Sequence, residues 1–67
     1  MYNQEQFLAE KFSNFLRAWG EFHYIYTEAD ISEQCMNNVL GVFDPNVVEL
    51  TISKEDDHYE LHGRIKR

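Results

Sequence analysis

The sequence has little of what small domains usually rely on for extra stability. It has a single cysteine, Cys35, which excludes an intrachain disulfide. Its glycines stand far apart, at Gly20, Gly41 and Gly63, which excludes a glycine-rich phosphate-binding loop. No apolar run approaches the length of a membrane-spanning helix. The first residues also lack the basic and apolar regions of a signal peptide, so we expect a cytosolic protein.

Cations are scarce too. Six Lys and Arg residues face twelve Asp and Glu residues, for a net charge of −6. Residues 21–60 contain ten acids and one cation, Lys54. Such a body repels phosphate and attracts basic protein surfaces, so we expect a basic protein partner and neither direct nucleic-acid binding nor membrane binding. The short basic tail at residues 64–67 is too small to reverse this expectation. Ordinary solubility is the alternative explanation of the charge.

Aromatic residues, in contrast, are plentiful: five Phe, four Tyr and one Trp in 67 residues. We expect one domain, residues 1–67. A domain of this size buries only about 60% of the surface that its unfolded chain exposes. The aromatic content exceeds what so small a core comfortably hides, which favours burial against a partner or a second copy.

Two helices are predicted. Residues 4–19 carry an apolar stripe at helical spacing, with Asn3 and Gln6 at capping positions and Gly20 as a stop. Residues 28–41 carry a second stripe, with Thr27 as N-cap, Asp30 at the capping-box position and Gly41 at C′. Acidic residues in the first turns of this helix suit its dipole, which is their simplest role.

Strands are predicted between and after the helices. Residues 21–27 are aromatic and β-branched, which favours a strand with Phe22, Tyr24 and Tyr26 on one face. A longer first helix is the alternative. After a turn at residues 44–46, two alternating segments predict a hairpin centred on Glu55-Asp56. That register pairs Ile52 with Tyr59, Leu50 with Leu61, Val48 with Gly63, Thr51 with Glu60, Glu49 with His62, and Val47 with Arg64. The expected fold class is α+β: one or two amphipathic helices packed on a small antiparallel sheet that ends in a C-terminal β-hairpin.

Residue types that carry chemistry are few. His58, Glu60 and His62 alternate on one strand face, but about 13 Å separates the two histidines at about 3.4 Å per residue. One zinc ion cannot reach both, so no metal site is expected, and a Glu49–His62 ion pair is the simpler role. Cys35 lies on the apolar stripe of the second helix, as inert buried cysteines do. We expect no catalytic, cofactor-binding or metal-binding residues, and therefore no enzyme.

The expected function is binding of another protein. Small acidic inhibitors from phages and mobile elements, and toxin immunity proteins, share this size and charge. This analogy suggests an inhibitor or modulator of a basic or nucleic-acid-handling protein. Acidic side chains would steer the partner, and exposed aromatic side chains would supply affinity. The candidate partner-binding residues are Glu28, Asp30, Glu33, Glu55, Asp56, Asp57, Glu60, Trp19 and Tyr24. The alternative is a homo-oligomeric structural or accessory subunit, such as a homodimer, without enzymatic activity.

Overall fold

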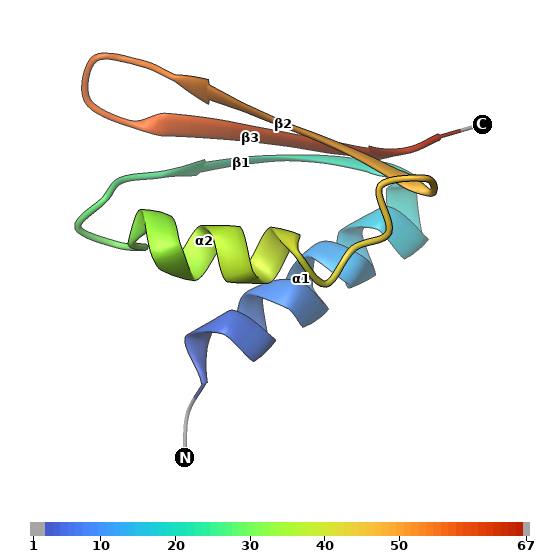
Figure 1. The fold of residues 1–67 in the computed structure, drawn as a ribbon. Coiled ribbons are helices and arrows are strands. Elements are labelled where there is room, and N and C mark those ends of the chain that lie inside the picture. The colour runs from blue at the N-terminus through green and yellow to red at the C-terminus, as the bar shows by residue number, and fades with distance from the viewer. Residues whose placement is uncertain (1–2, 67) are drawn as a thin grey trace.

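The chain forms two layers in a computed structural model that describes residues 3–66. The element order is α1 (Gln4–Trp19), β1 (Glu21–Tyr26), α2 (Glu33–Leu40), β2 (Val48–Lys54) and β3 (Tyr59–Ile65). The strands form one antiparallel sheet in the order β1-β3-β2, and both helices cover one face of it (Figure 1). The predicted α+β class is confirmed. Met1, Tyr2 and Arg67, which belong to the N-terminal segment and the basic tail discussed above, lie outside the described residues.

Helix α1 has the predicted bounds because both of its ends are capped. The Asn3 side chain accepts a hydrogen bond from the Gln6 backbone N–H, which satisfies one free donor of the first turn. Gly20 takes a left-handed conformation, with φ 77°, and donates its N–H to the Leu16 carbonyl. A residue with a side chain is strained there, so glycine ends the helix and turns the chain into β1. The strand interpretation of this next segment is confirmed for Glu21–Tyr26.

Helix α2 is shorter than predicted and begins at Glu33 instead of residue 28. Its N-cap is Ser32, whose Oγ accepts a hydrogen bond from the Cys35 N–H at 3.1 Å. Thr27 and Asp30 do exchange hydrogen bonds, but they close an isolated turn before the helix. In this arrangement Ile31 is buried directly before the cap. In a helix that began at residue 28, Ile31 would instead be a residue inside the helix. Gly41 ends α2 without the left-handed conformation of a typical C′ glycine.

The hairpin exists, but its predicted register is wrong by two residues. Ile52 pairs with Leu61, Leu50 with Gly63, and Val48 with Ile65. A shift of two keeps the same side chains on the inner face, the face that the helices cover, because strand side chains alternate with a period of two. The polar pairs change with the shift: Thr51 faces His62, Ser53 faces Glu60, and Glu49 faces Arg64.

Gly63 lies between β1 and β2 on the inner face, where both neighbouring strands pack closely against it. A Cβ atom built on Gly63 would lie 2.3 Å from Phe22 Cε1 and 3.0 Å from Leu50 Cδ2. The missing side chain therefore leaves space for the Phe22 ring, which stacks on Phe12 at 4.7 Å between centroids. The loop at residues 55–58 closes with a hydrogen bond from the Glu55 N–H to the His58 carbonyl at 2.9 Å.

The core lies between the helices and the inner face of the sheet. Its most deeply buried large side chains are Phe12, Met36, Leu61 and Val39. Much of the aromatic surface noted in the sequence is used here, since Phe12 contacts both Phe22 and Tyr24. Within residues 3–66, neither helix combines the length and the hydropathy that a bilayer crossing requires.

Candidate functional site

Six of the predicted partner-binding acids gather at one end of the molecule. Glu28, Asp30 and Glu33 lie on the segment that joins β1 to α2 and on the first turn of α2, and Glu55, Asp56 and Asp57 form the hairpin tip. Both segments lie at the same end of the fold, at the left of Figure 1. We call these six residues the acidic end. The sequence places them up to 29 positions apart, and the fold brings them together.

A direct contact joins the two parts of the acidic end. The Tyr59 hydroxyl donates a hydrogen bond to Glu28 Oε1, across the gap between the hairpin and the β1–α2 segment. This hydrogen bond to a carboxylate is the main cause that raises the pKa of Tyr59 to about 12. Glu28 and Tyr59 also line a surface hollow with the hairpin tip, Lys54 and His58. Tyr59 thus gives the acidic end a half-buried aromatic wall.

Cations are nearly absent from this end. A second surface hollow at this end is lined by residues that include Glu33, Ile52, Lys54 and Tyr59. Among the described residues that line these two hollows, Lys54 is the only Lys or Arg. Its ammonium lies 6.0 Å from the centroid of the Tyr59 ring, where a cation–π attraction holds it. The second hollow adds apolar surface, because Ile52 lies beside Glu33 and Lys54 and is 40% exposed. The acidic end therefore combines carboxylates with an accessible apolar patch.

The two aromatic candidates are placed apart from the acidic end. Trp19 is 71% exposed at the last residue of α1, at the opposite end of the molecule. Tyr24 faces inward on β1, where it packs edge-on against Phe12 at 5.2 Å and lies under the Lys11 ammonium at 5.2 Å. Of these two candidates, Trp19 offers the exposed aromatic surface that partner contacts use, and Tyr24 is half-buried.

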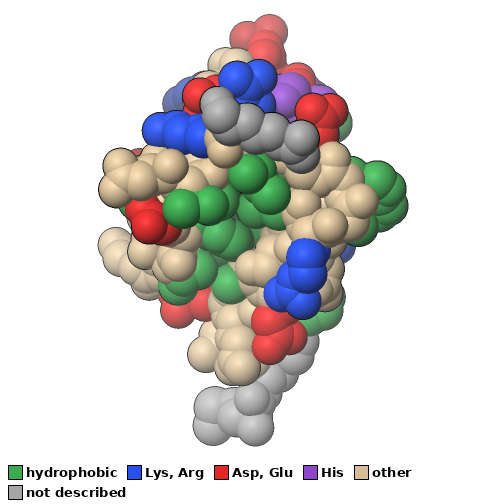
Figure 2. All heavy atoms as spheres, turned by 90° about the vertical axis from the view of Figure 1, so that its right-hand side faces the viewer, with side chains coloured by type: hydrophobic (Ala, Val, Ile, Leu, Met, Phe, Trp, Pro, Cys, Tyr) green, Lys and Arg blue, Asp and Glu red, His purple; other side chains and the backbone are tan. Residues whose placement is uncertain are grey.

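The end that carries Trp19 differs in chemistry from the acidic end. Figure 2 views this end, where hydrophobic side chains gather at the centre and both cationic and acidic side chains lie around them. Val42 and Val47, in the loop between α2 and β2, are 66% and 49% exposed. Arg64 lies at the end of β3, with its Nε 3.6 Å from Glu49 Oε1. The ion pair that the sequence analysis assigned to Glu49 and His62 is therefore wrong: Glu49 pairs with Arg64, because the register differs by two residues.

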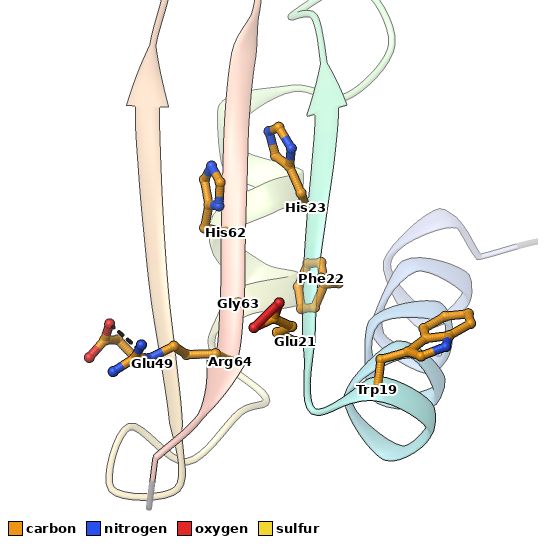
Figure 3. Close-up of a pocket in the computed structure, with 8 residues that line it drawn as sticks. All are labelled: Trp19, Glu21, Phe22, His23, Glu49, His62, Gly63 and Arg64. Atoms are coloured by element: carbon orange, nitrogen blue, oxygen red, sulfur yellow. Dashed lines mark ion pairs between the residues drawn. The ribbon is translucent and has the colours of Figure 1, made fainter.

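The face of the sheet that points away from the helices, here called the outer face, is open and polar. A hollow of about 760 Å³ lies across β1 and β3 at the Trp19 end (Figure 3). His23 and His62 stand side by side on these neighbouring strands and line the hollow. They are directly opposite each other in the register, and their rings stack with 4.2 Å between centroids.

Glu60 completes a cluster with these two histidines. Its Oε1 lies 2.9 Å from His23 Nε2, and its Oε2 lies 3.1 Å from His58 Nε2. His58 in turn places its Nδ1 2.6 Å from Asp57 Oδ1. The hydrogen bonds from His58 and His23 lower the pKa of Glu60, and those to Asp57 and Glu60 raise the pKa of His58. We call His23, Glu60 and His62 the His/Glu cluster.

The sequence pattern put His58, Glu60 and His62 on one strand face, and no metal site was expected of these three residues. His58 is bound to Glu60, but the group whose donor atoms converge contains His23 instead. His23 could not be chosen from sequence, because its approach to His62 depends on β1 pairing with β3 and not with β2. The one available signal was a histidine at an outward position of a predicted strand. Glu60, predicted as a partner-binding acid, is half-buried in this cluster and not part of the exposed tip.

Cys35 is half-buried on α2, with its Sγ 3.6 Å from Gln4 Oε1. Burial, followed by the charge of Glu5, raises the pKa of the Cys35 thiol. This shift disfavours the thiolate, which is the form that a cysteine nucleophile needs.

Comparison of the chain with protein-family models, curated proteins and solved structures gave no match. A functional proposal for this chain therefore rests on the arrangement of its own side chains.

Proposed function

We propose that this chain is a small acidic protein-binding module that uses its acidic end to engage a basic surface on a partner protein. In its most specific form, the proposal is an inhibitor or modulator of a basic or nucleic-acid-handling protein. The observation that supports it is the convergence of Glu28, Asp30, Glu33 and the hairpin tip, from two separate segments, at one end of the fold.

Physical chemistry gives each part of this end a role. The tip residues Glu55, Asp56 and Asp57 are exposed, so their charges reach far into solvent and accelerate encounter with a cationic partner. Tyr59 and Ile52 lie directly behind the acids and supply the apolar contact that slows dissociation. The same negative charge repels phosphate, so the module does not bind nucleic acid itself. It competes with nucleic acid for the basic surface of the partner protein.

A second candidate function, self-association, rests on a different surface. Trp19 is the most exposed large apolar side chain in the described residues, and Ile25 on the edge strand β1 is 59% exposed. A homodimer that buries Trp19 would leave the acidic end free, because Trp19 lies at the opposite end of the molecule. Light scattering across protein concentrations separates the two candidates, since a stable dimer whose formation requires Trp19 favours a homo-oligomeric subunit.

The test is a tagged pull-down from native cell extract at low and high salt with three forms of the protein. The first is wild type, and the second is Glu55→Ser/Asp56→Ser/Asp57→Ser at the acidic end. The third, Glu10→Gln/Glu21→Gln/Glu49→Gln, removes the same charge elsewhere. A true partner is captured at low salt by wild type and by the third form, and is lost with the second. With that partner purified, the second form should associate more slowly and show a weaker salt dependence. Equal association rates for the second and third forms would reject the acidic end as the binding surface.

A further inference from the structure

The His/Glu cluster on the outer face has the donor set of a metal site. Two imidazoles and one carboxylate offer nitrogen and oxygen donors, and one donor atom from each residue lies within 4.8 Å of the others. Imidazole and carboxylate together suit Zn²⁺ and its first-row neighbours, whereas Ca²⁺ and Mg²⁺ favour oxygen donors alone. From this geometry we propose that His23, Glu60 and His62 bind a divalent transition-metal ion, with Zn²⁺ as the expected ion. This proposal replaces the expectation from sequence that the chain has no metal site.

The backbone holds the three side chains where one ion can reach them. His23 and His62 are directly opposite on β1 and β3, and Glu60 lies two residues before His62 on the same strand. All three side chains therefore point to the outer face, since residues two apart on a strand share a face. The two strands are paired along their length, so the spacing of the Cα atoms is set by the sheet and not by a loop.

Only small side-chain movements separate the described geometry of the three side chains from the geometry of an ion-bound site. Donors around a tetrahedral Zn²⁺ lie about 3.3 Å apart, because each is about 2 Å from the ion. His23 Nε2 and Glu60 Oε1 are already 2.9 Å apart, so an ion between them takes the place of the shared hydrogen. The two imidazole planes are within 16° of parallel, so one ring must turn for both lone pairs to face the ion. Both rings are exposed and have room to turn.

An outer layer of hydrogen bonds orients the carboxylate. Glu60 uses Oε2 to contact His58, which leaves Oε1 on the side of His23. Asp57 contacts the other nitrogen of His58 and fixes the direction of that ring. Outer partners of this kind fix the orientation of metal ligands, and their loss typically lowers metal affinity about 10- to 100-fold. The chain from Asp57 through His58 to Glu60 thus gives His58 a positioning role.

The surroundings attract a divalent cation and leave one of its coordination positions accessible to solvent. The chain carries a net charge of −6, so a divalent ion is attracted from solution. His23 and His62 also line the 760 Å³ hollow of Figure 3, which gives water or another small ligand access to the ion. Three protein ligands with one exchangeable position is the arrangement that zinc adopts outside closed structural sites.

The experiment titrates metal-stripped full-length protein with ZnCl₂ by calorimetry and with CoCl₂ by visible absorption. We expect one ion per chain, with a dissociation constant of about 10 μM or lower. Cobalt should show the intense absorption bands of a tetrahedral site. The imidazole NMR signals of His23 and His62 should change most on addition of zinc.

Matched variants locate the ion. His23→Gln, His62→Gln and Glu60→Gln should each weaken binding at least about tenfold, and His58→Gln should weaken it less than they do. Glu49→Gln removes a carboxylate from the same face, and Cys35→Ser removes the thiol; both should bind zinc like wild type. Circular dichroism establishes that each variant is folded. Absence of one-to-one binding by folded wild type, or unchanged binding in His23→Gln and His62→Gln, would overturn the proposal. Loss of binding in Cys35→Ser would also overturn it by placing the ion elsewhere.

Discussion

The inner face of the sheet is apolar and mostly covered by the helices, whereas the outer face is open and polar. Leu61 on the inner face of β3 is completely buried, and Ile25 on the outer face of β1 is 59% exposed. The inner face contacts two helices, while the outer face carries the His/Glu cluster and the Glu49–Arg64 ion pair. Inner-face residues therefore stabilise the fold, whereas outer-face residues are available to bind a ligand. Outer-face residues can change to suit a ligand without disturbing the core.

The sharpest test of this comparison is a pair of truncations on the two faces. Leu61→Ala should lower the free energy of unfolding by about 2–5 kcal/mol, because it opens a cavity in a filled core. Ile25→Ala should lower it by less than about 1 kcal/mol, since it loses little buried area and only some strand propensity. Urea denaturation followed by circular dichroism measures both. If Leu61→Ala is already unfolded in buffer, its loss exceeds the whole stability of the domain. Similar losses for the two variants would contradict the comparison.

Gly63 offers the next largest effect, since it lies on the inner face where the sheet is most tightly packed. Gly63→Ala would place its Cβ 2.3 Å from the Phe22 ring, and we expect a loss of about 1–3 kcal/mol from overpacking. Gly41→Ala is the matched control, because its Cβ would meet only ordinary contacts of 3.4 Å and 3.5 Å. Its backbone conformation also suits alanine, so we expect no loss or a gain of about 0.4–1 kcal/mol.

The same contact can be tested from its other side. Phe22→Leu removes the ring that a Gly63 side chain would strike, so Gly63→Ala should cost less in that background than in wild type. Equal costs in both backgrounds would show that Phe22 does not limit the space at Gly63. Thermal unfolding of the four proteins in this cycle gives the answer.

Periodicity predicted the faces of the elements well. The buried stripe of α1 and the inward set on the hairpin follow from apolar spacing. The bounds of α1 follow from its capping residues, and the strand at Glu21–Tyr26 follows from its aromatic and β-branched content. Helix α2 was placed too early because Thr27 and Ser32 can both cap a helix. The helix uses Ser32 as its cap, and Ile31 is buried directly before it.

Pairing between strands could not be predicted in the same way. Two registers that differ by two residues bury the same side chains, so the alternation in the sequence does not choose between them. In the observed register Leu50 lies opposite Gly63, with its Cδ2 3.0 Å from the position that a Gly63 Cβ would take. The candidate sites inherit this limit. The exposed acids of the tip follow from composition, whereas the meeting of His23 with His62 requires the strand order.

The smallest expected effect lies on the outer face, at the Glu49–Arg64 ion pair. Its side chains are 49% and 67% exposed, with 3.6 Å between Glu49 Oε1 and Arg64 Nε. Water and salt screen such a pair, so a double-mutant cycle with Glu49→Gln and Arg64→Gln should give a coupling of about 0.2–1 kcal/mol. The coupling should fall as salt is added, because both groups face solvent.

The value of this cycle is that it also tests the register. In the register expected from sequence, Glu49 faces His62 and Arg64 faces Val47, so Glu49 and Arg64 would not be a directly opposite pair. A parallel cycle with Glu49→Gln and His62→Gln serves as the control and should give a coupling smaller than that of Glu49 with Arg64. The reverse order of the two couplings would contradict the observed pairing of β2 with β3. It would leave the His/Glu cluster intact, because that cluster depends on the pairing of β1 with β3.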